Sequence, residues 1–75
     1  MDELKSIVAE NLKALRTSAG LTQGELANRL NYSDKAVSKW ERGESLPDVQ
    51  VLKQLADMYG VGVDYLLSSE ASDSV

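Results

Sequence analysis

The side chains best suited to chemistry lie between residues 28 and 42. The 75-residue chain has a net charge of −4, yet this stretch carries a local balance of +2. Its cations are Arg29, Lys35, Lys39 and Arg42. Lysine and arginine attract phosphates and donate hydrogen bonds, so one interpretation is a strip that binds a polyanion. The other interpretation is an ordinary solvated face, because scattered cations are common on exposed surfaces.

The composition excludes several kinds of chemistry. The chain has no cysteine and no histidine, which removes disulfides, thiol nucleophiles, Cys/His zinc sites and histidine general bases. Catalysis would then need paired carboxylates or a lysine in a deep cleft, for which so short a chain has little room. We therefore expect no enzyme, no metal and no cofactor. No apolar run approaches the about 20 residues that span a bilayer, which favours a soluble, cytoplasmic domain.

The spacing of the apolar residues predicts an all-α protein with one domain over residues 1–67. Apolar positions recur at helical steps, and strand-like alternation is always brief. The expected helices cover residues 2–19, 22–30, 33–42, 49–59 and 63–67. Residues 68–75 are rich in serine and lack periodicity, so they are expected to form a flexible tail or linker.

Capping residues and apolar stripes support these boundaries. Thr22 and Glu25 have the spacing of a capping box. Ser33 and Asp48 are favourable N-caps, and Asn31 tolerates the left-handed conformation that ends a helix. Glycine supplies the other helix ends, at Gly20, Gly43 and Gly60. The expected core positions are Leu4, Ile7, Val8, Leu12, Leu15, Ala19, Leu26, Ala27, Leu30, Ala36, Val37, Trp40, Val49, Leu52, Leu55, Ala56 and Tyr59.

The two short helices in the middle are joined by the three residues 31–33. So short a connection forces the helices to cross steeply, as in a helix-turn-helix. The second of them has few apolar residues and a polar, cationic outer face, which suits the major groove of DNA. An ordinary surface helix of a small bundle is the alternative.

A longer set of motifs identifies a family. The run from Thr22 to Ala27 (TQGELA), Ser33, the block from Val37 to Gly43 (VSKWERG), Leu55-Ala56 and the run from Val63 to Leu67 (VDYLL) occur in this order. Together they resemble the Cro/C1-type (Xre-family) helix-turn-helix domain of phage and bacterial repressors. The resemblance implies a compact five-helix, lambda-repressor-like domain. It also implies binding to double-stranded DNA as a transcriptional regulator, expected to be a repressor, and pairing as a homodimer on inverted half-sites.

The resemblance implies two sets of DNA contacts. The positions that face the groove and read bases correspond to Asp34, Lys35, Ser38 and Lys39. The positions that contact phosphate correspond to Thr22, Gln23 and Arg42. Asp34 is unusual among them, because DNA phosphates repel a carboxylate. It either accepts a hydrogen bond from a cytosine amino group or serves only the start of its helix. Gln23 could likewise be no more than an exposed residue at a helix start.

The resemblance also implies a structural ion pair between Arg16 and Glu41, partly buried, that clamps the first helix to the helix over residues 33–42, which is the recognition helix of this family. Arginine suits this role because its planar fork can hold a carboxylate by two hydrogen bonds. The alternative is that both side chains are solvated, in which case the pair contributes almost nothing.

Two questions of partnership stay open. Residues 43–75 carry a balance of −5, which would suit an antitoxin-like or adaptor module that binds a basic protein, with DNA contact secondary. If two copies pair, the candidate surface is residues 44–47 together with Tyr65 and Leu66. The alternative is that Leu46 and Leu66 belong to the core.

Overall fold

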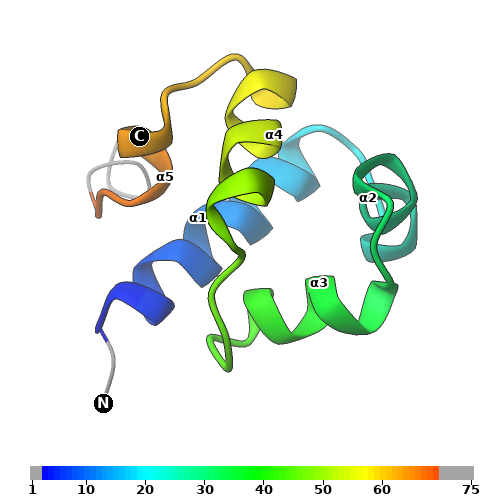
Figure 1. The fold of residues 1–75 in the computed structure, drawn as a ribbon, viewed down its shortest axis with the longest axis horizontal. Coiled ribbons are helices and arrows are strands. Elements are labelled where there is room, and N and C mark those ends of the chain that lie inside the picture. Colours follow the sequence, from blue (N-terminus) through cyan, green and yellow to red (C-terminus); the bar gives the residue numbers. More distant parts are fainter. Residues whose placement is uncertain (1–2, 70–75) are drawn as a thin grey trace.

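A computed structural model describes residues 3–69, and within them the chain forms five helices and no strand. The helices are α1 (Glu3–Ser18), α2 (Gln23–Leu30), α3 (Asp34–Glu41), α4 (Val49–Tyr59) and α5 (Val63–Leu66). This confirms the predicted all-α class and the order of its elements. α3 lies along one edge of the domain, with α1 and α4 above it and α2 at its start (Figure 1). None of the helices in this part of the chain is long and apolar enough to cross a membrane.

The predicted capping box forms at the start of α2. The Thr22 hydroxyl accepts from the backbone N–H of Glu25 at 3.0 Å, and the Glu25 carboxylate accepts from the backbone N–H of Thr22 at 2.8 Å. At the other end, Asn31 has φ 65°, the left-handed conformation expected of it. Ser33 then caps α3 by accepting from the backbone N–H of Ala36. The turn between α2 and α3 is therefore as short as predicted.

The end of α3 lies against α1. Gly43 follows α3 with φ +74°, and a Cβ built there would lie 3.7 Å from the carbonyl oxygen of Lys5. A side chain at this position would be strained by the backbone conformation alone. The positive φ, and not the spacing to α1, therefore explains the glycine that ends this helix.

The core lies where α1, α2, α3 and α4 meet, and most of the predicted positions belong to it. Its buried members are Val8, Leu12, Leu26, Ala27, Leu30, Val37, Trp40, Val51, Leu52, Leu55, Ala56 and Leu66. Trp40 is 5% exposed, as expected of a core residue, and its ring lies 5.5 Å from that of Tyr32 between centroids.

Three positions of the predicted apolar stripes were wrong. Val49 is 82% exposed, and Val51, not predicted, is fully buried in its place. Val49 begins α4 and lies about 90° around the helix from the middle of the buried face. Leu4 is 40% exposed and Ala19 is exposed, because the ends of α1 extend beyond the helices that cover its middle.

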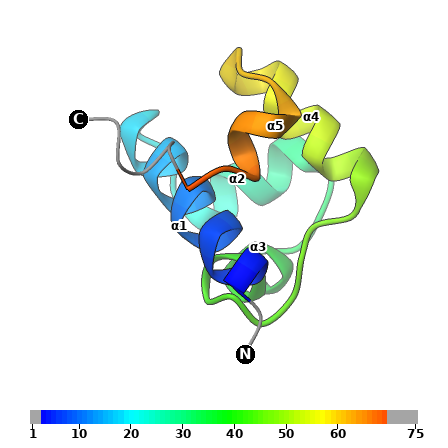
Figure 2. The ribbon, with the colours of Figure 1, turned by 90° about the vertical axis from the view of Figure 1, so that its left-hand side faces the viewer.

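A buried asparagine joins the last helix to the first. Asn11 is 1% exposed, and its Nδ2 donates to the carbonyl oxygens of Leu66 at 2.8 Å and Ser68 at 3.0 Å. These bonds hold the end of α5 beside the middle of α1 (Figure 2). The flexible tail expected over 68–75 lies, from residue 70 onward, outside the described residues.

Candidate nucleic-acid interface

The crossing of α2 and α3 positions the candidate interface. Leu26, Ala27 and Val37 are all buried where the two helices meet. The small side chain of Ala27 lets the helices approach closely, and the short turn fixes their steep angle. As a result, the start of α2 and the outer side of α3 both belong to the surface of the domain (Figure 1).

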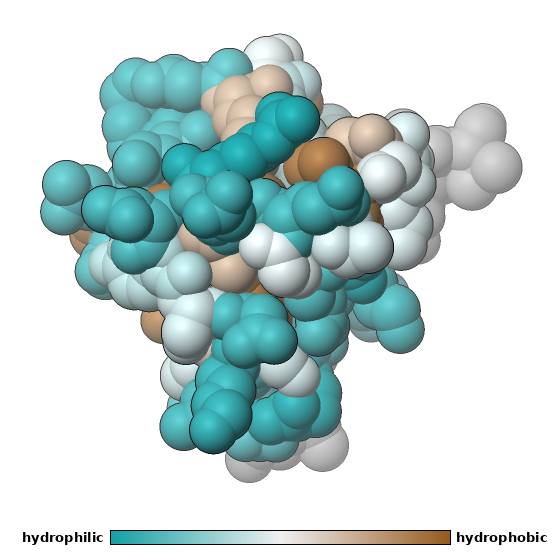
Figure 3. All heavy atoms as spheres, turned by 90° about the vertical axis from the view of Figure 1, so that its right-hand side faces the viewer, coloured by the Kyte–Doolittle hydropathy of each residue, from teal (hydrophilic) through white to brown (hydrophobic). Residues whose placement is uncertain are grey.

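The outer side of α3 is polar and open. Asp34, Lys35 and Lys39 are exposed, and none of the three side chains has a hydrogen bond or ion pair with any residue of the described range 3–69. The surface over α2 and the start of α3 is largely hydrophilic (Figure 3). Three of the four positions assigned to base reading are thus accessible and unpaired, as a groove-facing surface requires.

Ser38 and Arg42 are brought together at the end of α3, where Arg42 is the C-cap. Nη1 of Arg42 donates to the Ser38 hydroxyl, one turn earlier, and Nε of Arg42 donates to Oε2 of Glu44 at 2.6 Å. The hydrogen bond with Glu44 raises the pKa of Arg42 and lowers the pKa of Glu44. Two residues assigned to DNA contact are therefore engaged within the protein: Ser38 by Arg42, and Arg42 by Glu44, a carboxylate that the motifs did not mark.

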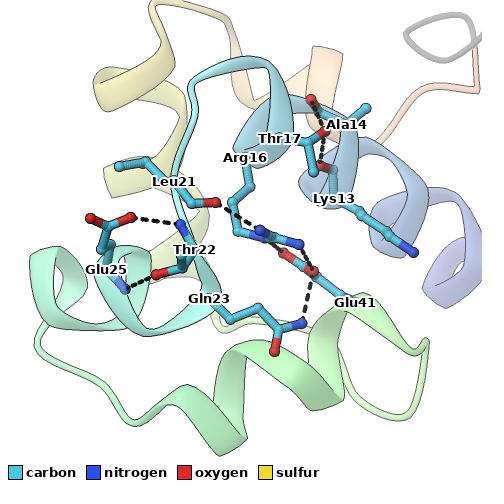
Figure 4. Close-up of polar contacts among 9 residues, drawn as sticks. All are labelled: Lys13, Ala14, Arg16, Thr17, Leu21, Thr22, Gln23, Glu25 and Glu41. Carbon is cyan, nitrogen blue, oxygen red and sulfur yellow. Dashed lines mark hydrogen bonds and ion pairs between the residues drawn. The ribbon is translucent and has the colours of Figure 1, made fainter.

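The inner side of α3 is held by a second arginine. Nε of Arg16 donates to Oε2 of Glu41 at 2.7 Å, and Nη2 of Arg16 donates to Oε1 at 3.0 Å (Figure 4). The third nitrogen, Nη1, donates to the carbonyl of Leu21 at 2.7 Å. The side chains of Arg16 and Glu41 are 12% and 3% exposed. The hydrogen bond with Glu41 raises the pKa of Arg16.

Gln23 completes this network. Its Nε2 donates to Oε1 of Glu41 at 3.0 Å, so α1 and α2 both bind the same carboxylate of α3 (Figure 4). Gln23 is partly buried, unlike the exposed helix-start residue that was the alternative. Its amide nitrogen has a second N–H, and the Thr22 hydroxyl, which accepts from Glu25, keeps a proton to donate. Both groups can thus stabilise the fold and still donate to a phosphate.

Sequence reasoning missed three polar groups that the fold uses or buries. Asn11 lies on the apolar stripe three residues after Val8, and a polar residue on a buried stripe is the signal that could have revealed it. The Tyr32 hydroxyl donates to Oδ2 of Asp48 at 3.1 Å, which links the turn before α3 to the N-cap of α4. Burial raises the pKa of Tyr59, and its hydroxyl has no partner among residues 3–69.

The surface expected to pair two copies is only partly available. Leu66 is fully buried, so its place in that surface was wrong and the core alternative holds. Pro47 is buried as well. Leu46 and Tyr65 are each 37% exposed and remain accessible.

Comparison with known proteins agrees with this geometry. A family model described as "Helix-turn-helix" matches residues 12–66. The HTH-type transcriptional activator BcrR of Enterococcus faecalis is 44% identical over 61 residues, covering 81% of this chain and 30% of BcrR. The structure of the SOS-response transcriptional repressor LexA from Eubacterium rectale has a TM-score of 0.85 at 27% identity, covering 89% of this chain and 71% of that one. The DNA-binding domain of S. venezulae BldD has a TM-score of 0.74 at 33% identity, covering 89% and 100%.

The chain belongs to the Cro/C1-type helix-turn-helix family of DNA-binding transcriptional regulators. The resemblance noted in the sequence is thereby confirmed. The chain spans 30%, 50% and 58% of three curated relatives that it matches, so these proteins contain segments with no counterpart here.

Proposed function

We propose that the domain over residues 1–67 binds double-stranded DNA sequence-specifically, with α3 in the major groove. One observation carries the proposal: the open side of α3 presents unpaired Asp34, Lys35 and Lys39, while its other side is held by the buried Glu41 network. A helix whose inner side is held by the fold and whose outer side is polar can present side chains to base edges at a defined depth in the groove.

The proposed contacts follow from where the side chains lie. Lys35 and Lys39 donate to guanine O6 or N7, and Ser38 contacts a base once Arg42 moves from it. Asp34 accepts from a cytosine amino group or serves only the helix start. Phosphate contacts come from the three residues Thr22, Gln23 and Arg42, of which the first two are at the N-terminus of α2, where backbone N–H groups also favour an anion.

For the assembly we propose a homodimer on DNA that acts in the cytoplasm. Two copies would place their α3 helices about 34 Å apart, one turn of the duplex, on inverted half-sites. The accessible residues for the contact are Leu46 and Tyr65. Bound duplexes without two-fold symmetry would contradict the dimer.

We propose repression as the direction of regulation. A domain bound to its site excludes other proteins from the DNA that it covers. The names of similar proteins include both directions, since LexA is called a repressor and BcrR an activator. A reporter gene placed downstream of the DNA site that the domain prefers distinguishes repression from activation. Repression requires expression of the reporter to fall when the protein is supplied.

The second candidate function is an antitoxin-like or adaptor module that binds a basic protein. The acidic balance of residues 43–75 favours it. Its discriminating property is salt dependence on DNA. Binding to duplex through several phosphates must weaken steeply with salt, with a slope of about −0.9 per phosphate. A nearly salt-independent association with DNA would favour the protein-binding candidate.

The main test is selection of bound duplexes from a random pool, followed by measurement of Lys39→Ala. We expect this variant to lose about 1–3 kcal/mol of binding free energy on the preferred site and to lose preference at one base position. Equal weakening on preferred and random duplex would contradict base reading by Lys39. Lys53→Ala is the matched control, because it removes the same charge from α4, where Lys53 is paired with Asp57.

A further inference from the structure

Glu44 lies at the end of the recognition helix in direct contact with a cation of the proposed interface. The backbone fixes its place: the N–H of Glu44 donates to the carbonyl of Lys39 at 3.0 Å, and the N–H of Gly43 donates to that of Trp40 at 3.2 Å. With Gly43 left-handed between them, Arg42 and Glu44 face each other. The contact therefore follows from how α3 ends.

Arg42 is held at two of its three nitrogens. Nε binds the Glu44 carboxylate, and Nη1 binds the Ser38 hydroxyl one turn earlier on α3. The guanidinium thus lies along the outer side of α3, close to the groove-facing positions. A carboxylate and a phosphate use the same planar fork of an arginine, so Glu44 occupies Arg42 where a DNA phosphate would.

Glu44 also acts on a second cation of the interface. Arg42 has the largest part in lowering the pKa of Glu44, through their hydrogen bond, and the charge of Lys39 lowers it further. The carboxylate is therefore ionised at neutral pH beside two of the cations that are proposed to meet DNA. Any phosphate that approaches this end of α3 meets a negative charge as well as two positive ones.

We propose that Glu44 is an intramolecular competitor of the DNA phosphate at Arg42, and that it sets the strength of the sequence-independent part of binding. The inference rests on the proposed function. While Glu44 holds Nε of Arg42, a phosphate can take the two-bond grip that includes Nε only by displacing the carboxylate. The displaced carboxylate is then repelled by the DNA phosphates. Phosphates are the same in every duplex, so a competitor for the phosphate contact lowers affinity for every duplex alike.

The test is Glu44→Gln, measured on the selected site and on random duplex at several salt concentrations. We expect binding to strengthen several-fold on both, and the salt dependence to steepen by about 0.9 per protomer as one phosphate contact is added. Between 50 and 200 mM salt this steepening multiplies the loss of affinity by about 3.5-fold. The side chain of Glu44 is 52% exposed, so the variant should melt at the wild-type temperature.

Asp57→Asn is the matched control. Asp57 also belongs to an exposed ion pair, with Lys53 on α4 at 2.8 Å, and the substitution changes net charge by the same amount. If Asp57→Asn strengthens binding and steepens the salt dependence as much as Glu44→Gln does, net charge alone explains the effect and the proposal is overturned. In an Arg42→Met background, Glu44→Gln must strengthen binding no more than Asp57→Asn does, because the competitor then has no arginine to occupy.

Two further outcomes separate this inference from the function on which it rests. If the wild-type domain binds no duplex at any salt, the proposed function fails and the competitor fails with it. If the wild type binds DNA but Glu44→Gln weakens only the selected site, Glu44 holds Arg42 in place for base reading, and the competitor alone is contradicted.

Discussion

Two arginine–glutamate pairs lie at the end of α3 and use the neighbouring residues Glu41 and Arg42. Glu41 binds Arg16 on the inner side, where the side chains are 12% exposed for the arginine and 3% for the glutamate. Arg42 binds Glu44 on the outer side, where the corresponding values are 54% and 52%. The donor–acceptor distances are similar, 2.7 and 2.6 Å. Distance therefore does not distinguish the pairs, and burial does.

The difference in burial assigns the pairs different tasks. Successive helix positions are rotated by about 100°, so residues 41 and 42 face different surroundings. Within the fold, an ion that loses its partner stays out of water, which makes the loss costly. On the surface, water and salt screen the pair, and either partner is free to bind another ion. The inner pair thus serves the fold, and the outer pair is available to a ligand.

The largest effect is expected from breaking the inner pair. Arg16→Met or Glu41→Gln strands the other side chain and should lower the free energy of unfolding by about 3 kcal/mol or more. Urea unfolding followed by circular dichroism measures this loss. DNA binding should weaken in parallel because the fold is lost, although neither residue needs to contact a base. An unchanged melting temperature for Arg16→Met would contradict a structural role for the pair.

A smaller effect on the free energy of unfolding, this time a gain, is expected from a substitution at Tyr59. The Tyr59 hydroxyl is buried without a partner among the described residues, so Tyr59→Phe should raise the stability by about 1 kcal/mol. Burial is the main cause of the raised pKa of Tyr59, and the charge of Glu41 raises it further.

The pH dependence of Tyr59→Phe gives an independent check. A group whose pKa is raised by folding contributes stability at pH values below its pKa in the unfolded chain, which is about 10 for tyrosine. This contribution is lost as the pH rises through the pKa of the group in the folded protein. Wild-type stability should therefore fall more steeply above pH 10 than that of Tyr59→Phe. If the stability of the two proteins falls in parallel as the pH rises, folding does not raise the pKa of the Tyr59 hydroxyl.

The smallest effect on the fold is expected from the outer pair. Arg42→Met makes the same substitution as Arg16→Met, but in the exposed pair. It should leave the melting temperature unchanged. Its effect on DNA binding should also be modest while Glu44 is present, because that carboxylate already occupies the arginine. Marked loss of stability would mean that the outer pair, too, holds the fold together.

Local signals predicted the parts of this fold that depend on neighbours in the chain. The capping box of Thr22 and Glu25 and the left-handed Asn31 each follow from residues within a few positions, so sequence sufficed for them. Val49 and Val51 show where that information ends. Both are apolar, both lie in the first turn of α4, and only the placement of the other helices decides which one is buried.

The candidate site also contains contacts that the sequence could not predict. Gln23 was assigned to phosphate by resemblance, but its bond with Glu41 depends on how α2 is placed against α3. Asn11 reaches residues 55 and 57 positions away, a contact that no local pattern contains. Glu44 is close to Arg42 in the chain, yet nothing in the motif shows that the backbone turns the two side chains toward each other.

The carboxylate of Glu41, bound by both α1 and α2, also separates the scaffold from the surface that we propose reads DNA. Rotation of α3 about its own axis would break all three bonds at once, so the helix has one orientation whatever residues it presents outward. Lys35 and Lys39 hold no other part of the described chain in place, which means that they can be exchanged without repacking the domain. The domain is for this reason a suitable starting point for engineering: libraries confined to a few outward positions should yield readers of new operators that keep the original fold.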